Sequence, residues 1–357
     1  MTGNTALDST LDGKWKRPTT RMLKGLQRSG LLLAMTIMCG VLGIMAPAHA
    51  QAQGLGGLFG NLAISAAASR LNRYINDNQP IVRDWSTVYP HVDELPGPPF
   101  QPRDVPAVTW SRSLEVSGYR GVALPPGDYS MPVQLFCMHF SGGSAPGYTY
   151  LLGPLRGTRA AMITRLMGRA AVRRVPHDRV QVLAWALQSG MTYEQLDPES
   201  RSLFDALLPE YRSALGPGPL VQALQFWQVL ASAIPGGPSF NDILNRVGAA
   251  PILAGYQNAQ QIITQDAGNF QQLSQRLLYL SLGAQGNSTT VKPWSIVAPG
   301  VYARMVTGST AMGPGSLQFR ILPTALAADH ETVTVPIMEM VARGGAGFLD
   351  TKSAPVM

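Results

Sequence analysis

The pattern of apolar and polar positions changes twice along the chain and divides most of it into three parts. From residue 107 to 140, and again from 291 to 343, short apolar runs punctuated by Gly and Pro are typical of β-strands. Between residues 157 and 283 the apolar positions recur every three to four residues, as they do in helices. The pattern therefore predicts an α+β protein, with β-sandwich-like strands at its N- and C-terminal sides flanking a central helical region.

The first β part is expected over residues 107–150. It contains AVTW (107–110), LEVSGYRGVAL (114–124) and YSMPVQLFCMHF (129–140), and each of these runs is predicted as a strand or part of one. The last run is apolar on both faces, which is typical of a strand buried between two layers. Cys137 and His139 would lie on the same side of that strand because they are two residues apart.

The helical region, residues 151–285, contains local signals for helix starts. Asp197 is a suitable N-cap residue and is followed by a proline, which favours the first helical position. Ser239 and Asp242, like Thr192 and Gln195, have the spacing of a capping box. A second β part is expected over 286–345, and residues 346–357 are expected to be a loose tail.

Residues 51–106 follow neither pattern. A Gly-rich, uncharged start precedes residues 61–76, whose apolar positions fall near one face and predict a helix that docks on a core. A membrane-surface role for this helix is the alternative, although its polar face holds only Arg70 and Arg73. The prolines between residues 77 and 106 predict an extended, ordered or semi-rigid linker.

The first 50 residues have the three parts of a secretory signal peptide. Six Lys and Arg residues precede the apolar run SGLLLAMTIMCGVLGIMA (29–46), and small residues follow at Ala48 and Ala50. The run is short for a membrane-spanning helix and contains three glycines. Cleavage near Ala50 and a periplasmic or secreted location are expected, and either Met1 or Met22 can be the translation start.

Removal of the predicted leader would lower the net charge, which is +7 for the 357 residues. The predicted leader holds six of the 28 Lys and Arg residues and two of the 21 Asp and Glu residues, which leaves 22 basic and 19 acidic residues. Most of the positive excess thus belongs to the leader, and nucleic acid is not an expected partner. Charged residues make up 14% of the chain, too few for a disordered, highly charged protein.

The search for catalytic motifs gives only isolated candidates. Cys137 with His139 or His177 as the base could form a thiolate nucleophile, and Ser144 could serve as a serine nucleophile with the same histidines. The histidines are far apart in the sequence and lack metal-ligand spacing, so neither a metal nor another cofactor is expected. A secreted cysteine or serine hydrolase is the alternative function, and the same cysteine could equally be a small buried apolar residue.

An arginine-rich segment follows the first β part. Arg165, Arg169 and Arg173 are four residues apart and lie on one helical face, which predicts an anion-binding stripe for phosphate, an acidic glycan or a lipid headgroup. The alternative is a solvated face whose arginines pair with acidic residues of the helices that follow.

Two Pro-Gly turns repeat one short motif. Pro126-Gly127-Asp128-Tyr129 and Pro299-Gly300-Val301-Tyr302 each precede a predicted strand. The motif resembles the P-G-x-Y turn of bacterial immunoglobulin-like and prealbumin-like β-sandwich modules. That resemblance implies a fold class and no activity. It leaves open whether the two β parts form one split sandwich or two separate elements.

These observations favour a non-catalytic protein of the cell envelope. The signal peptide predicts export, and no catalytic constellation stands out in the sequence. We therefore expect a binding or assembly component whose partner is an envelope protein, an acidic glycan or a lipid headgroup. No transmembrane helix is expected in the chain after the leader.

Overall fold

A computed structural model describes most of the chain after the predicted leader. The described residues are 52–82, 87–138, 150–231, 239–278, 293–307, 313–327 and 330–344. The chain divides into two units, residues 1–59 and 60–357. Apart from residues 52–59, which form the start of a helix, the elements described below belong to the second unit. The leader, His139, Ser144 and the predicted tail lie outside the described residues.

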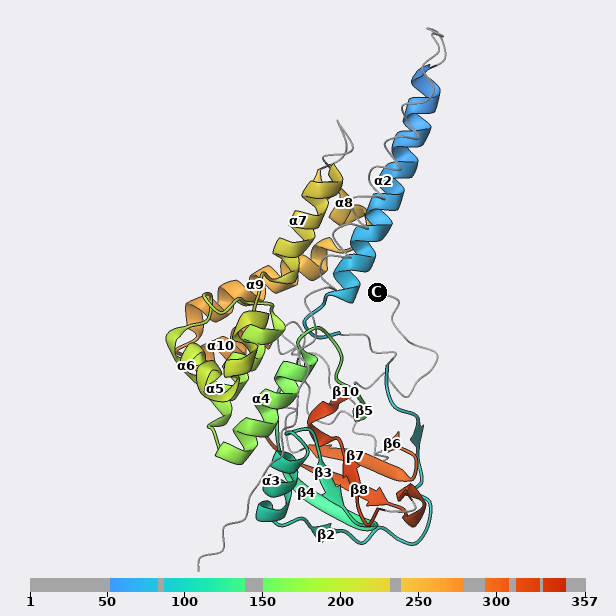
Figure 1. Cartoon of the computed structure of the whole chain (residues 1–357), viewed down its shortest axis with the longest axis vertical. Helices are drawn as coiled ribbons and strands as arrows, with labels where there is room; N and C mark the ends of the chain where they lie inside the picture. Colours follow the sequence, from blue (N-terminus) through green and yellow to red (C-terminus); the bar gives the residue numbers. More distant parts are fainter. Residues whose placement is uncertain are drawn as a thin grey trace, which may run out of the picture. The chain divides into compact units, whose positions relative to one another are not determined.

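Strands from both sides of the helical region join in one sheet, drawn at the bottom of Figure 1. Within the described residues it has the order β1-β6-β7-β8-β4-β2. Its pairs are antiparallel except for β2 with β4. The strands are β1 (His91–Val92), β2 (Arg103–Asp104), β4 (Gly127–Leu135), β6 (Trp294–Ala298), β7 (Val301–Thr307) and β8 (Gly313–Ile321). The two β parts of the sequence are therefore not separate elements, and the predicted mixed α+β class is confirmed.

Two short antiparallel ladders accompany this sheet. One pairs β3 (Val122–Leu124) with β9 (Val333–Val335), and the other pairs β5 (Tyr150–Pro154) with β10 (Met340–Gly344). Like the sheet, each ladder joins a strand that precedes the central helical region with a strand that follows it. Closing such pairs needs contacts between residues far apart in sequence, which local patterns do not specify.

The two Pro-Gly turns lie at the same end of the sheet but differ in register by one residue. Gly127 of β4 and Val301 of β7 both lie opposite Ile321 of the strand between them. Tyr129 and Tyr302 therefore point to opposite faces of the sheet, because successive residues of a strand alternate between faces. Tyr129 is buried in the core, and Tyr302 is half-buried on the other face.

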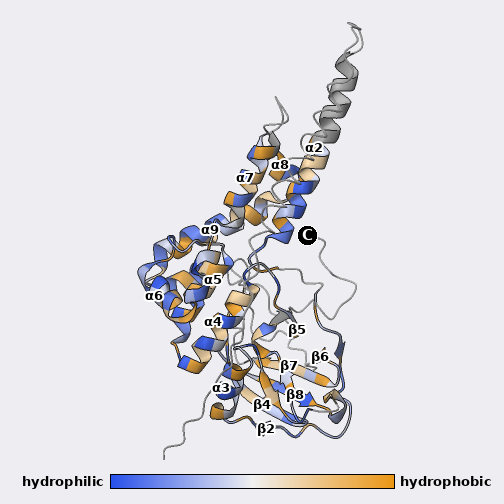
Figure 2. Ribbon diagram, viewed as in Figure 1, coloured by the Kyte–Doolittle hydropathy of each residue, from blue (hydrophilic) through white to orange (hydrophobic). Residues whose placement is uncertain are grey.

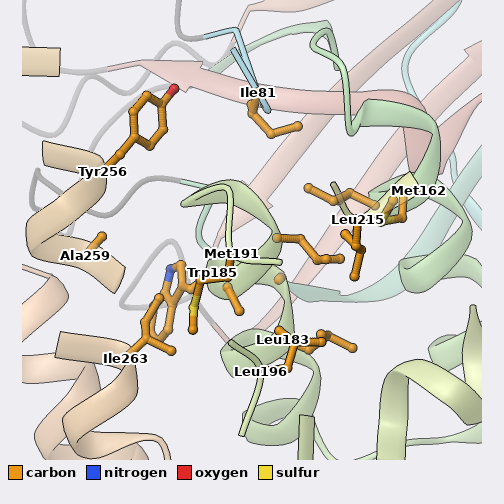
Figure 3. Packing of buried hydrophobic residues seen from close by; sticks show 14 of the residues in the cluster. Ile81, Met162, Leu183, Trp185, Met191, Leu196, Leu215, Tyr256, Ala259 and Ile263 are labelled. Atoms are coloured by element: carbon orange, nitrogen blue, oxygen red, sulfur yellow. The ribbon is translucent and has the colours of Figure 1, made fainter. Parts of the chain in front are cut away.

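The helices form the other part of this unit (Figure 1). They are α2 (Ala52–Asp77), α3 (Ala107–Val116), α4 (Ala160–Arg173), α5 (His177–Gln188), α6 (Pro198–Leu207), α7 (Pro219–Ala231), α8 (Phe240–Arg246), α9 (Ala250–Asp266) and α10 (Phe270–Leu277), with short 3-10 helices η1 (Pro209–Ala214), η2 (Pro323–Ala325) and η3 (Ile337–Glu339). Helix α5 lies at the centre of their core. Its Trp185 is fully buried and lies beside Ile263 of α9 (Figure 3).

Local capping signals correctly located two helix starts. The Asp197 carboxylate accepts hydrogen bonds from the first backbone N–H groups of α6, and Ser239 and Asp242 form a reciprocal capping box at α8. Thr192 and Gln195 do interact, with the Thr192 N–H donating to Gln195 Oε1 over 2.7 Å. They close a turn before α6, however, and no helix begins there.

The strand expected at residues 107–110 is wrong, because this segment forms the first turn of helix α3. The strand expected over 114–124 is wrong at its start for the same reason, since α3 continues to Val116 and the strand is confined to Val122–Leu124. Leu114 is fully buried on one side of α3 with Trp110 half-buried beside it, whereas Val108 and Val116 are exposed on the other side. The β-branched Val and Thr residues suggested a strand. Docking of the Leu114 face on the core outweighs that weak preference.

Residues 64–77 of α2 form the docked helix that the sequence predicts. Ala68, Leu71 and Ile75 are buried in the helical core, and the helix begins earlier than expected, at Ala52. The proline-rich segment after α2 is ordered where it is described and contributes the short strands β1 and β2. Among the described residues, no helix combines the length and the apolar character needed to cross a membrane.

Candidate functional site

The sequence suggested that Cys137 lies within a strand. In the structure it lies just beyond the end of β4. Its backbone N–H donates to Gln181 Oε1 over 2.7 Å, and its carbonyl accepts from Gln181 Nε2 over 2.9 Å. Gln181, on α5, is fully buried. Its amide pairs with both the N–H and the carbonyl of Cys137, as the backbone of a neighbouring strand would. A second α5 side chain, Gln188, reaches the same carbonyl over 3.4 Å. The cysteine is thus held against α5 through its backbone.

His177, the first residue of α5, holds the same stretch of chain. Its Nε2 lies 3.1 Å from the carbonyl oxygen of Leu135, and its Nδ1 lies 3.2 Å from Asp178 Oδ1. The imidazole stacks on Phe136, with ring centroids 4.8 Å apart, and meets the edge of Phe270. A general base needs a ring nitrogen free to accept a proton, and both nitrogens here face oxygen acceptors. The geometry therefore gives His177 a structural role.

The other two candidate catalytic residues, His139 and Ser144, lie outside the described residues. The hydrolase hypothesis thus stays a prediction from the sequence. Neither the burial of Cys137 nor the contacts of His177 adds support to it.

Two arginines of the predicted anion stripe contact the end of α6. Arg169 makes a two-point ion pair with the Glu210 carboxylate, at 2.9 and 3.0 Å, and also donates to the Leu207 carbonyl. Arg173 donates to the carbonyl of Ala206 over 2.8 Å. The last carbonyls of a helix lack partners within the helix and carry partial negative charge, so cations stabilise them.

Tyr119 completes this packing beside α4. The guanidinium carbons of Arg165 and Arg169 lie 5.9 and 5.2 Å from its ring centre. Burial alone would raise the pKa of Glu210, but its hydrogen bonds, with Arg169 among the donors, hold the pKa below its ordinary value. The three predicted residues do share one face of α4. Two of them are already engaged by α6 and η1, in line with the alternative of internal pairing.

Other arginines donate hydrogen bonds to carbonyl groups at helix ends, which no pattern in the sequence indicated. Arg159 is buried and donates from Nη1 to the carbonyls of Leu187 and Met191, over 3.0 and 2.9 Å, at the end of α5. Burial lowers the pKa of its guanidinium to about 10, so the group stays charged at neutral pH. This residue caps α5 in the same way that Arg169 and Arg173 cap α6.

The polar face of the large sheet carries a second cluster of arginines. Arg320 forms a buried two-point ion pair with Asp128, with both N–O distances 2.6 Å. The Nη1 of Arg320 also donates to the carbonyls of Pro96 and Pro98, each over 2.8 Å. The Gln101 N–H donates to Asp128 Oδ2 over 2.9 Å. These bonds hold the proline-rich segment against the sheet.

Arg304 lies on the same face, two residues after Tyr302. Its guanidinium carbon is 4.2 Å from the ring centre of Trp294 and 5.7 Å from that of Phe100. Its Nε donates to Gln318 Oε1, directly across the sheet, over 2.8 Å. Burial lowers the pKa of Arg304. In the part of the chain that the structure describes, no Asp or Glu forms an ion pair with it.

A signal for this cluster was present in the sequence. Alternation along 301–307 and 313–321 puts Arg304 and Arg320 on the faces opposite Ala303 and Phe319. The positive charge between residues 156 and 179 was more conspicuous because its arginines are close in sequence. What distinguishes Arg304 is its burial without a carboxylate, which depends on contacts across the sheet.

The described residues contain no cluster of three or more His, Cys, Asp or Glu side chains that could hold a metal ion. Comparison of the chain with known protein families, with curated proteins and with solved structures gives no match.

Proposed function

We propose that the protein is an exported, non-catalytic component of the cell envelope that binds or assembles with another envelope protein. The observation that supports this most is the outward side of α7 and α9, which combines apolar side chains with uncharged amides. Val221 and Leu224 of α7 are 46% and 39% exposed, and Ile252 of α9 is 37% exposed. Val221 and Leu224 lie one helical turn apart, and exposed apolar groups that lie together are typical of protein-binding surfaces.

The inward face of α7 fixes which residues point outward. Ala223 and Trp227 are buried in the helical core, and Phe226 stacks on Tyr74 of α2 with ring centroids 4.8 Å apart. The Tyr74 hydroxyl donates to Gln222 Oε1 over 3.1 Å. The opposite side of α7 therefore faces outward and includes the exposed residues Val221, Leu224, Gln225 and Gln228. Figure 2 shows the apolar residues distributed along this helix.

Charge is scarce throughout this part of the molecule. Helix α7 has no charged residue, and the exposed side chains of α9 and α10 include Gln257, Gln261, Gln265, Gln271, Gln272 and Gln275. Asp266 pairs with Arg276, and Asp242 is engaged in its capping box. Charged groups are the most costly to remove from water, so a surface with so few available charges is suited to burial against another protein.

Export is supported by the sequence of the leader, and it has a direct test. Mature protein isolated from the envelope fraction should begin at Gln51. Replacing Ala48 and Ala50 with Arg should block cleavage and leave the full-length chain. Recovery of the intact chain from the cytoplasm of wild-type cells would contradict the proposal.

Site-specific photocrosslinking tests the binding role. A benzoylphenylalanine at Leu224 should crosslink to one discrete envelope protein in intact cells. The same group at Val116 of α3, which is 84% exposed, is the matched control and should not crosslink. Absence of any adduct from Leu224, with the protein folded and exported, would overturn the proposed function.

We also propose that the two short ladders and the large sheet pack as layers of a sandwich-like unit. In support, Val122, Leu152 and Val335 of the ladders share one core with Tyr129 and Phe319 of the sheet. A double-mutant cycle between Leu152→Ala and Phe319→Leu tests this packing. Coupling well below about 0.5 kcal/mol would contradict it.

A further inference from the structure

We propose that the polar face of the large sheet binds an acidic saccharide, whose carboxylate is held by Arg304. This site is distinct from the outward surface of α7 and α9. Saccharide binding at this face goes beyond the proposed assembly role and does not depend on it.

The charge of Arg304 favours an anionic ligand. Arg304 is half-buried and cationic, and among the described residues no acidic side chain compensates it. Asp128 is paired with the neighbouring Arg320, so its negative charge is not available to Arg304. Holding a cation away from water without a counterion is unfavourable, and the lowered pKa of Arg304 has this cause. An anionic ligand would supply the missing partner.

The orientation of the Arg304 guanidinium favours a carboxylate as the anion. The hydrogen bond from Nε to Gln318 and the position over the Trp294 ring orient the guanidinium, and Phe100 meets Trp294 edge-on with ring centroids 4.8 Å apart. No group of the described chain accepts a hydrogen bond from the two terminal nitrogens, Nη1 and Nη2. Two parallel N–H donors at the end of a fixed guanidinium match the two oxygens of a carboxylate.

The side chains around Arg304 favour a saccharide as the molecule that carries this carboxylate. Phe100 is half-buried, and Tyr302, next on the same face of β7, is half-buried and carries a hydroxyl. Aromatic faces suit the C–H groups of a sugar ring, and a hydroxyl suits its polar edge. A lipid surface is normally recognised by a cluster of cations, whereas this face offers one uncompensated arginine in the described chain. We therefore commit to an acidic saccharide.

Isothermal titration of the purified full-length protein tests the ligand. A galacturonate oligomer should bind, and the same oligomer with its carboxyl groups reduced to alcohols should bind at least about tenfold more weakly. Vesicles of phosphatidylcholine with phosphatidylglycerol are the third arm and should not bind. Equal binding of the reduced oligomer, no binding of the acidic oligomer, or binding of the vesicles alone would each overturn the proposal.

Substitutions of Arg304 test its role in holding the carboxylate. Arg304→Gln should weaken binding of the galacturonate oligomer by about tenfold or more, and Arg304→Lys should weaken it severalfold because lysine lacks the planar pair of donors. Arg112→Gln removes the same charge from an exposed position of α3 and should bind as the wild type does. Wild-type affinity in Arg304→Gln would refute the assignment.

A measurement on the wild-type protein avoids any folding defect of these variants. Phenylglyoxal modifies accessible arginines, and peptide mass spectrometry reports the extent at each position. The galacturonate oligomer should protect Arg304 and leave Arg112 unprotected. Equal modification of Arg304 with and without the oligomer would overturn the proposal, whatever the outcome of the crosslinking at Leu224.

Discussion

Arg320 of β8 and Asp128 of β4 are directly opposite each other in the sheet and form a buried, two-point ion pair. Their side chains are 4% and 12% exposed. Arg320 also binds carbonyls of the proline-rich segment, and Asp128 accepts from the Gln101 N–H. One pair of residues therefore joins two strands from opposite sides of the central helical region, and it also holds the proline-rich segment that lies against them.

Removing the carboxylate from this pair should be strongly destabilising. Asp128→Asn leaves the Arg320 charge buried without compensation, which we expect to lower the free energy of unfolding by roughly 3–5 kcal/mol. Urea denaturation measures the loss. Glu199→Gln is the matched control because it breaks the exposed Arg179–Glu199 pair, and it should cost about 1 kcal/mol or less. A loss no larger than that of the control would contradict the role given to Arg320 and Asp128.

The same pair predicts a pH dependence. Burial alone would raise the pKa of Asp128, but hydrogen bonds from Arg320 and the Gln101 N–H hold it below its ordinary value. The resulting stability is fully present above the pKa of an unfolded Asp, about 3.9, and is lost as the pH falls through the lower pKa of the folded state. Wild-type stability should therefore drop more steeply below about pH 4 than that of Asp128→Asn. Parallel curves from urea titrations would argue against this linkage.

Gln181 should be essential to the position of Cys137. Gln181→Leu leaves the buried N–H and carbonyl of Cys137 without the amide, and we expect a loss of about 2–5 kcal/mol in the free energy of unfolding. Hydrogen exchange at the Cys137 amide should accelerate as well. Gln225→Leu on the exposed side of α7 is the control and should change stability by about 0.5 kcal/mol or less. Unchanged exchange at Cys137 in Gln181→Leu would disprove the assignment.

Two helical glycines should respond in opposite directions to the same substitution. At Gly168 of α4 an added methyl group would overlap the Tyr119 carbonyl oxygen, so Gly168→Ala should destabilise the protein by about 1–3 kcal/mol. At Gly255 of α9 the space is open, and Gly255→Ala should stabilise by about 0.5–1 kcal/mol through better helix propensity. Thermal unfolding of both variants would reveal the sign. A stabilising Gly168→Ala would show that α4 does not approach Tyr119 this closely.

Features set by neighbouring residues were predictable from the sequence. The Asp197 N-cap, the Ser239 capping box and the docked face of α2 each depend on residues within about two turns of one another. The helical identity of α3 was missed because burial of Leu114, a long-range effect, decides it. Arg169 illustrates the same limit: its charge was evident, but its partners Leu207 and Glu210 lie about 40 residues away.

The sequence by itself determined the mixed class of the fold, two helix starts and the expectation of export, because these depend on composition and on local spacing. Only the tertiary structure decided how its arginines are used. Arg320 is neutralised by Asp128, and Arg169 and Arg173 cap a helix, whereas Arg304 is half-buried without a carboxylate among the described residues. The physical reason is that the energy of a charge depends on its burial and on its partners, and both are set by contacts between distant parts of the chain.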